Sequence, residues 1–169
     1  MLGTIIFESK KMSYIQHNLQ RLYIVKVAKW FMLTMPILMI FYADMGFSTE
    51  QSFILKACYS LSIVVFEIPS GYAADMWGRK ITIVMGSILG SVGFLFYCVF
   101  SGFYAFMMAE IILGLGMSFI SGADSAMIYD TLKVHGRERD FVKYEGRNFS
   151  VGNFAEALAG LAGGALAYI

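Results

Sequence analysis

Five long apolar stretches, separated by short polar or charged segments, make up most of the sequence. A helix that crosses the hydrocarbon core of a bilayer needs about 20 residues, and each stretch reaches about that length. The predicted spans cover residues 22–43, 51–70, 81–100, 103–129 and 148–169, after a polar segment at 1–21. The pattern therefore predicts an all-α, polytopic membrane protein.

Small residues recur at helical spacing within these spans. Gly86 and Gly90 lie four positions apart in the third span, and Gly114, Ser118 and Gly122 form a stripe in the fourth. Small residues let helix backbones approach closely in lipid. We therefore expect the spans to pack against one another.

The composition supports a membrane protein and disfavours several other classes. The chain has 169 residues, of which 58% are hydrophobic and only 15% are charged, whereas soluble domains are about half apolar and a quarter charged. A net charge of +1 gives no indication of a nucleic-acid partner. Cys58 and Cys98 fall inside predicted spans without metal-ligand spacing, and the sequence has no nucleophile elbow or phosphate-binding loop. We expect a lipid bilayer around the chain, no cofactor and no enzyme activity.

The positive charges fall almost entirely on one side of the predicted bundle. Lysines and arginines precede or open the first span and occupy the connections at 71–80 and 130–147, while the other two connections carry none. The positive-inside rule places the N-terminus and these two connections in the cytoplasm. Lys56 is the exception, and its long side chain is expected to reach the headgroups. Pro36, inside the first span, is expected to kink that helix.

Residues 71–80, which read GYAADMWGRK, connect the second and third spans. This stretch resembles motif A of the major facilitator superfamily, G-x-L-A-D-R/K-x-G-R-R/K, which joins the same two helices in that family. Ala73 replaces the usual leucine and Met76 replaces the usual cation. The matching positions are Gly71, Ala74, Asp75, Gly78, Arg79 and Lys80. The resemblance extends over nearly the whole chain.

The resemblance implies a fold and a set of partners. In the superfamily two six-helix bundles face each other across a cavity, so five spans correspond to an incomplete N-terminal half of that fold. We expect the chain to be an N-terminal fragment in the cell membrane. The implied partners are a small-molecule substrate, protons and the remaining helices of the same transporter. Residues 155–164 resemble a degenerate motif C of the antiporter branches, which favours export, whereas Glu110 stands where motif B has an arginine.

Motif A forms a charge network in the family that holds the cytoplasmic side closed in the outward-open state. The corresponding residues here are Gly71, Asp75, Gly78, Arg79, Lys80 and Asp130. Asp75 is expected to accept backbone N–H bonds at a helix start, and Arg79 is expected to pair with Asp130. Gly71 would let the eleventh helix approach. The alternative is a cationic turn that only sets the orientation of the chain.

Three acids fall at membrane depth, where a charge is costly. Glu156 lies near the middle of the fifth span and is a candidate carrier of a coupling proton. Glu110 and Asp124 lie fourteen residues apart, nearly on one face of the fourth span, and the resemblance implies that this helix lines the cavity. The alternative for each acid is a structural contact with a neighbouring helix. The candidate charge partners are Lys26, Lys29 and Glu67.

These observations favour a secondary transporter that exports a small molecule in exchange for protons, represented by its N-terminal portion. A hypothesis from a different class is a small membrane scaffold or subunit that requires a partner chain. A reading frame that continues beyond Ile169 into further apolar spans would exclude the scaffold. The sequence does not identify the substrate.

Overall fold

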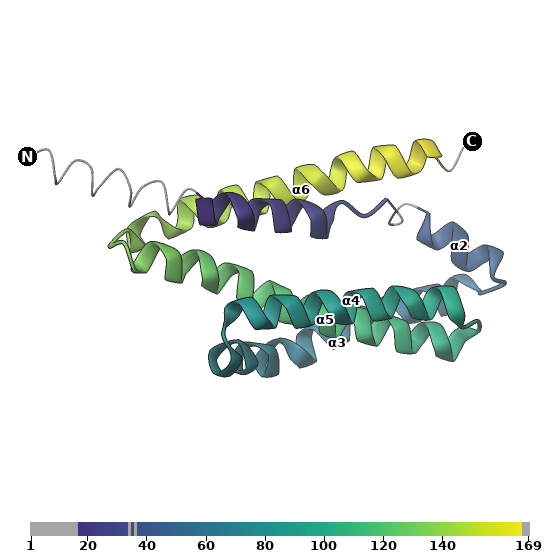
Figure 1. Ribbon diagram of the computed structural model, residues 1–169. Coiled ribbons are helices and arrows are strands. Elements are labelled where there is room, and N and C mark those ends of the chain that lie inside the picture. The colour runs from purple at the N-terminus through teal and green to yellow at the C-terminus, as the bar shows by residue number, and fades with distance from the viewer. Residues whose placement is uncertain (1–16, 34, 36, 167–169) are drawn as a thin grey trace, which may run out of the picture. The chain divides into compact units, whose positions relative to one another are not determined.

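A computed structural model describes residues 17–33, 35 and 37–166, and every regular element in them is helical (Figure 1). Residues 17–30 are helical. The elements that follow are α2 (Leu38–Asp44), α3 (Thr49–Trp77), α4 (Arg79–Val99), α5 (Phe103–Lys133), the 3-10 helix η1 (Glu138–Asp140) and α6 (Phe141–Leu166). Among the described helices, α3, α4 and α5 are long and apolar enough to cross a membrane. The predicted all-α class is confirmed.

The chain divides into two compact units. The central unit is Leu38–Ala126, which contains α2, α3, α4 and most of α5. The terminal unit combines Met1–Ile37 with Met127–Ile169 and therefore contains the helical segment 17–30 and α6. Each unit is described separately below.

Glycines bring the backbones of the central unit into direct contact. A Cβ atom on Gly86 of α4 would lie 2.7 Å from the carbonyl oxygen of Gly116 on α5. A Cβ atom on Gly114 would lie 2.6 Å from the carbonyl oxygen of Tyr59 on α3. The Ser118 and Ser70 hydroxyls, 2.8 Å apart, join α5 to α3 one turn further along. The predicted packing through small residues is confirmed at Gly86, Gly114 and Ser118.

The first predicted span is not one continuous helix. The helical segment ends at Trp30, the described residues 31–33, 35 and 37 are not helical, and α2 begins at Leu38. Helical backbone is disfavoured for a residue that precedes proline, and Met35, which precedes Pro36, lies in a turn. Pro36 itself lies outside the described residues, so the kink expected there stays a prediction.

The connection between α3 and α4 is shorter than the sequence suggested. Ser48 and Gln51 form a capping box that begins α3, and the helix continues through Gly71 and Asp75 to Trp77. Gly78 alone separates α3 from α4, with a φ angle of 89° that side chains rarely tolerate. The expected turn over residues 71–78 is therefore a break at a single glycine.

The terminal unit has its own apolar core. It is formed by Leu19 and Leu22 of the helical segment 17–30 with Ile128 and Leu132 near the end of α5. Helix α6 begins at Phe141, seven residues before the predicted start of the fifth span. The helix begins early because Phe141 and Tyr144 pack against this core, and such packing is the main source of helix stability in proteins.

The connection between α5 and α6 is held by a local ion pair. Asp140 accepts hydrogen bonds from Nε and Nη2 of Arg137 at 2.7 and 2.6 Å. This bond raises the pKa of the Arg137 guanidinium above its ordinary value, so Arg137 stays charged at any physiological pH. The pair closes the turn before η1 and sets where α6 begins.

Candidate functional site

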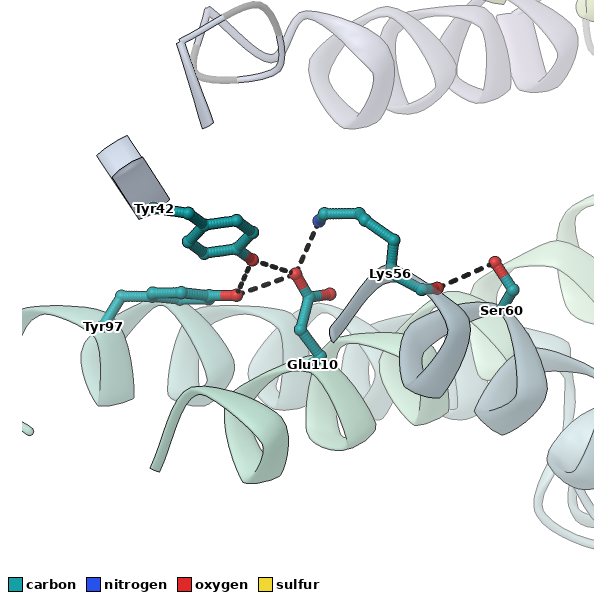
Figure 2. A network of polar contacts seen from close by, with 5 residues as sticks. All are labelled: Tyr42, Lys56, Ser60, Tyr97 and Glu110. Carbon is teal, nitrogen blue, oxygen red and sulfur yellow. Dashed lines mark hydrogen bonds and ion pairs between the residues drawn. The ribbon is translucent and has the colours of Figure 1, made fainter. Parts of the chain in front are cut away.

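Glu110 is a buried carboxylate at the junction of four helices. It lies in the second turn of α5, and only 1% of its side chain is exposed. Its Oε1 atom accepts hydrogen bonds from the Tyr42 hydroxyl at 2.6 Å, the Tyr97 hydroxyl at 2.7 Å and the Lys56 ammonium at 2.5 Å. Figure 2 shows the three donors converging on this one oxygen from α2, α4 and α3. We call these four residues the Glu110 network.

The two tyrosines of the network also contact each other. Their hydroxyl oxygens lie 2.6 Å apart, so one hydroxyl can donate to the other in place of its bond to Glu110, because each carries a single proton. Their rings are stacked with centroids 6.3 Å apart. The Lys56 ammonium lies 5.6 Å from the centre of the Tyr42 ring, within the range of a cation–π contact. Each donor thus has a second partner, so the position of every side chain depends on the others.

Aromatic side chains pack around the Tyr42 and Tyr97 part of the network, while Lys56 stays partly exposed. Phe106, one turn before Glu110, lies 4.7 Å from the Tyr97 ring and 5.7 Å from the Phe41 ring, centre to centre. Phe47 packs edge-on against Phe106 at 5.4 Å. Such a setting lowers the local dielectric, which strengthens the ion pair but makes a lone charge costly.

The energetic balance of the network depends on all its members being present. Taking a carboxylate and an ammonium out of water costs several kcal/mol for each ion, and their attraction offsets this only when hydrogen bonds satisfy the remaining lone pairs. The two tyrosines supply those bonds to Glu110. Lys56 remains 32% exposed, so part of its hydration is retained. The network therefore ties α2, α3 and α4 to α5 at one point.

The sequence alone assigned Lys56 no partner, and the structure supplies one. Its ammonium forms an ion pair with Glu110, and the expected contact with the headgroups stays a prediction. Glu110 pairs with a cation on an adjacent helix, as its structural alternative described, and its candidate role in proton coupling stays a prediction. A usable signal was present in the sequence, because Lys56 is the only cation in the predicted spans 51–70, 81–100 and 103–129, and Glu110 is one of three acids in them. Tyr42 and Tyr97 carried no comparable signal.

Glu110 and Asp124 do not lie together in the structure. Asp124 lies fourteen residues beyond Glu110 on the same helix, a separation of about 21 Å along the axis, and is 5% exposed. Glu156 is half-buried on α6 in the terminal unit. Glu110 and Asp124 thus belong to the central unit at different depths, so a proton site shared by two carboxylates is not formed there.

The candidate charge partners have different surroundings. Lys26 lies against α6, because a Cβ atom on Gly152 would be 3.4 Å from its Cγ and Cε atoms. The Lys29 ammonium is 6.0 Å from the centre of the Trp30 ring. Glu67 is exposed on α3. The expected pairing of Lys26 or Lys29 with Asp124 stays a prediction.

The motif A residues adopt a local arrangement that differs in part from the expected one. Asp75 lies in the last turn of α3 rather than at a helix start, and its carboxylate binds the Arg79 guanidinium at 2.7 Å. The expectation that Asp75 caps a helix N-terminus was therefore wrong, because the helix break falls three residues later, at Gly78. Lys80 and Asp130 are exposed, and a Cβ atom on Gly71 would meet nothing within 4 Å. The Arg79–Asp130 pair stays a prediction.

Comparison with known proteins decides the family. The sequence profile of the Major Facilitator Superfamily matches residues 23–169. The chain belongs to this superfamily. It is also similar to the quinolone resistance protein NorA of Staphylococcus aureus strains MRSA252 and N315, with 27% identity over 109 residues in both cases. The match covers 64% of this chain and 28% of each relative.

Membership of the superfamily agrees with the helical architecture. The chain is a multi-pass membrane protein, because the family match coincides with α3, α4 and α5, each able to cross a bilayer. Members of the superfamily are carriers of small molecules rather than enzymes. In the part of the chain that the structure describes, no group of histidines, cysteines and acids could hold a metal ion.

Proposed function

We propose that this chain forms part of the N-terminal bundle of a transporter that exports a small molecule from the cell in exchange for protons. The observation that carries the proposal is the superfamily match over residues 23–169 together with the similarity to a quinolone resistance protein. The degenerate motif C at residues 155–164 supports export over uptake. We place the protein in the cell membrane with its N-terminus in the cytoplasm, because the cations cluster on that side.

The Glu110 network supports a role for Glu110 in coupling. Three donors occupy Oε1, so a proton binds at this oxygen only if a donor withdraws. Lys56 is the donor with access to water, since its side chain is one-third exposed. In this mechanism a proton replaces the Lys56 ammonium on Glu110, which frees α3 to move relative to α5. Asp124 and Glu156 are further candidates for the proton path, and the motif A residues would hold the cytoplasmic side closed.

Coupling can be tested in energised inside-out membrane vesicles that contain the full protein. Addition of ethidium or of norfloxacin, a quinolone, should dissipate part of the pH gradient if export is coupled to proton entry. The Glu110→Gln variant should lose this response while still exchanging substrate down its own gradient. Asp124→Asn and Glu156→Gln variants test the other two acids in the same assay.

A matched control comes from an acid outside the network. Glu50 lies in the first turn of α3 and is exposed, so Glu50→Gln should respond like the unmodified protein. Full proton-coupled export by a variant that lacks all three buried or half-buried acids would remove the proton assignment. Absence of transport by the unmodified protein with any of a panel of cationic and quinolone compounds would remove the export proposal.

A further inference from the structure

The helical segment 17–30 and α6 lie side by side in the terminal unit and run in the same direction (Figure 1). Leu19 and Leu22 pack in a cluster with Phe141 and Tyr144 at the start of α6. Further along both helices, a Cβ atom on Gly152 would lie 3.2 Å from Cδ1 of Trp30. We call the contact between these two helices the α6 seam.

Buried polar atoms collect along the α6 seam without hydrogen-bonding partners. Asn148 is only 1% exposed, yet neither the oxygen nor the nitrogen of its carboxamide binds another group of the described chain. The same is true of the Tyr23 hydroxyl, the Trp30 indole nitrogen and one carboxylate oxygen of Glu145. These atoms lie along the same two turns of the seam. Tyr23 and Trp30 are two turns apart on helix 17–30, and Glu145 and Gly152 are two turns apart on α6.

Leaving these atoms without partners would be costly. An unsatisfied buried polar group costs about 1–3 kcal/mol in proteins, and a lipid surrounding offers no water in compensation. The large majority of buried side-chain polar atoms in proteins have a partner. Several unpaired groups within two turns of one contact therefore point to a partner outside the described part of the chain, either a further helix of the full protein or a bound molecule.

The chemistry of the unpaired atoms indicates what that partner must offer. The Trp30 indole nitrogen can only donate, while the Tyr23 hydroxyl and the Asn148 carboxamide can both donate and accept. Lys26 lies against Gly152 beside Trp30 and adds a positive charge. Donors thus predominate around Trp30 and Asn148, an arrangement that suits an oxygen acceptor such as a carbonyl or carboxylate group.

We propose that the α6 seam is a binding subsite for a carbonyl or carboxylate group of the transported molecule. The Trp30 indole N–H and the Asn148 side-chain NH₂ donate to its oxygen atoms, and the Trp30 ring provides a flat apolar wall. Lys26, a long and flexible side chain, moves aside to admit the group and pairs with it when it is charged. This inference rests on the proposed export function and deepens it, because it assigns part of the substrate selectivity to helix 17–30 and α6.

The test compares two probes on the full protein in lipid nanodiscs. Norfloxacin carries a ketone and a carboxylate, whereas ethidium is a flat cation without a carbonyl group. Trp30→Phe removes the N–H and retains the apolar ring, and Asn148→Leu removes the carboxamide at similar volume. Each change should weaken norfloxacin binding roughly five- to tenfold, the effect of one lost hydrogen bond of about 1–1.4 kcal/mol. Ethidium binding and transport should change less than twofold.

Asn153 provides a matched control, since it is an exposed asparagine on the same helix. Asn153→Leu should leave the affinity for both probes unchanged. Equal norfloxacin binding in the unmodified protein and in both seam variants would overturn the proposal and indicate that water satisfies the seam. Ethidium transport without any norfloxacin binding by the unmodified protein would also overturn it, while leaving the export function intact. Transport of neither probe would instead contradict the export function.

Discussion

Lys56 and Glu110 are 54 positions apart in the sequence, yet the ammonium nitrogen of one lies 2.5 Å from the carboxylate oxygen of the other. This contact joins α3 to α5 inside a cage of aromatic rings. The tyrosines of α2 and α4 bind the same carboxylate oxygen. The contacts of this one acid therefore depend on the relative positions of four helices.

Removal of the cation should leave a buried charge without compensation. We expect Lys56→Met to lower the free energy of unfolding by about 3–5 kcal/mol, the usual cost of breaking a buried ion pair from one side. The double variant Lys56→Met with Glu110→Gln should be more stable than Lys56→Met alone, because no charge is then buried. Denaturant titration in mixed micelles measures the free energy of unfolding of the unmodified protein, of Lys56→Met, of Glu110→Gln and of the double variant.

Lys133→Met serves as the control for that cycle, because Lys133 is exposed at the end of α5 and surface changes usually stay within about 0.5 kcal/mol. Additive effects of the Lys56 and Glu110 substitutions would show that the two side chains do not interact.

The Tyr97 hydroxyl should contribute to stability, because it donates its one proton to the buried Glu110 carboxylate. Tyr97→Phe keeps the stacked ring and removes only the hydroxyl. A hydrogen bond to a charged group contributes about 1.5–3 kcal/mol, so we expect a loss of stability in that range. Tyr104→Phe, at an exposed tyrosine on α5, should have no measurable effect. Equal unfolding midpoints for the two variants would mean that the Tyr97 hydroxyl contributes nothing to stability.

Gly114 should tolerate no larger residue. In Gly114→Ala the new methyl group would lie 2.6 Å from the Tyr59 carbonyl oxygen and 2.7 Å from the Ser62 Cβ atom, and neither backbone can yield without moving a helix. Overpacking of this kind costs about 1–3 kcal/mol. Gly122→Ala on the same helix meets nothing within 4 Å and should be neutral or slightly stabilising. Thermal unfolding of both variants in detergent tests the contrast.

Arg79 should matter more for transport than for stability. Its pair with Asp75 is partly exposed, and such pairs contribute about 0–1 kcal/mol. If motif A holds the cytoplasmic side closed, Arg79→Gln should slow export at least about fivefold. This factor is the lower end of typical coupling free energies between two conformational states. The exposed Arg139 provides the comparison, and Arg139→Gln should export normally. Equal export rates in Arg79→Gln and Arg139→Gln would indicate that motif A only sets the orientation of the chain in the membrane.

The sequence by itself determined the helical class, the approximate positions of the apolar helices α3, α4 and α5, and the family resemblance. Long apolar stretches require helices in lipid because only helices satisfy the backbone internally, and Gly78, Arg79 and Lys80 mark the connection between α3 and α4 by residue type alone. Glycine spacing also predicted the contacts at Gly86 and Gly114, since helical periodicity places such residues on one face.

Only the tertiary structure decided which polar side chains meet. The partners of Glu110 come from three other helices, and their convergence depends on helix rotation and depth, which hydropathy does not encode. The sequence suggested only the headgroups for Lys56, whereas helix packing places its ammonium against Glu110. The unpaired Asn148 and Trp30 on the α6 seam likewise became visible only when two segments more than a hundred residues apart were brought together.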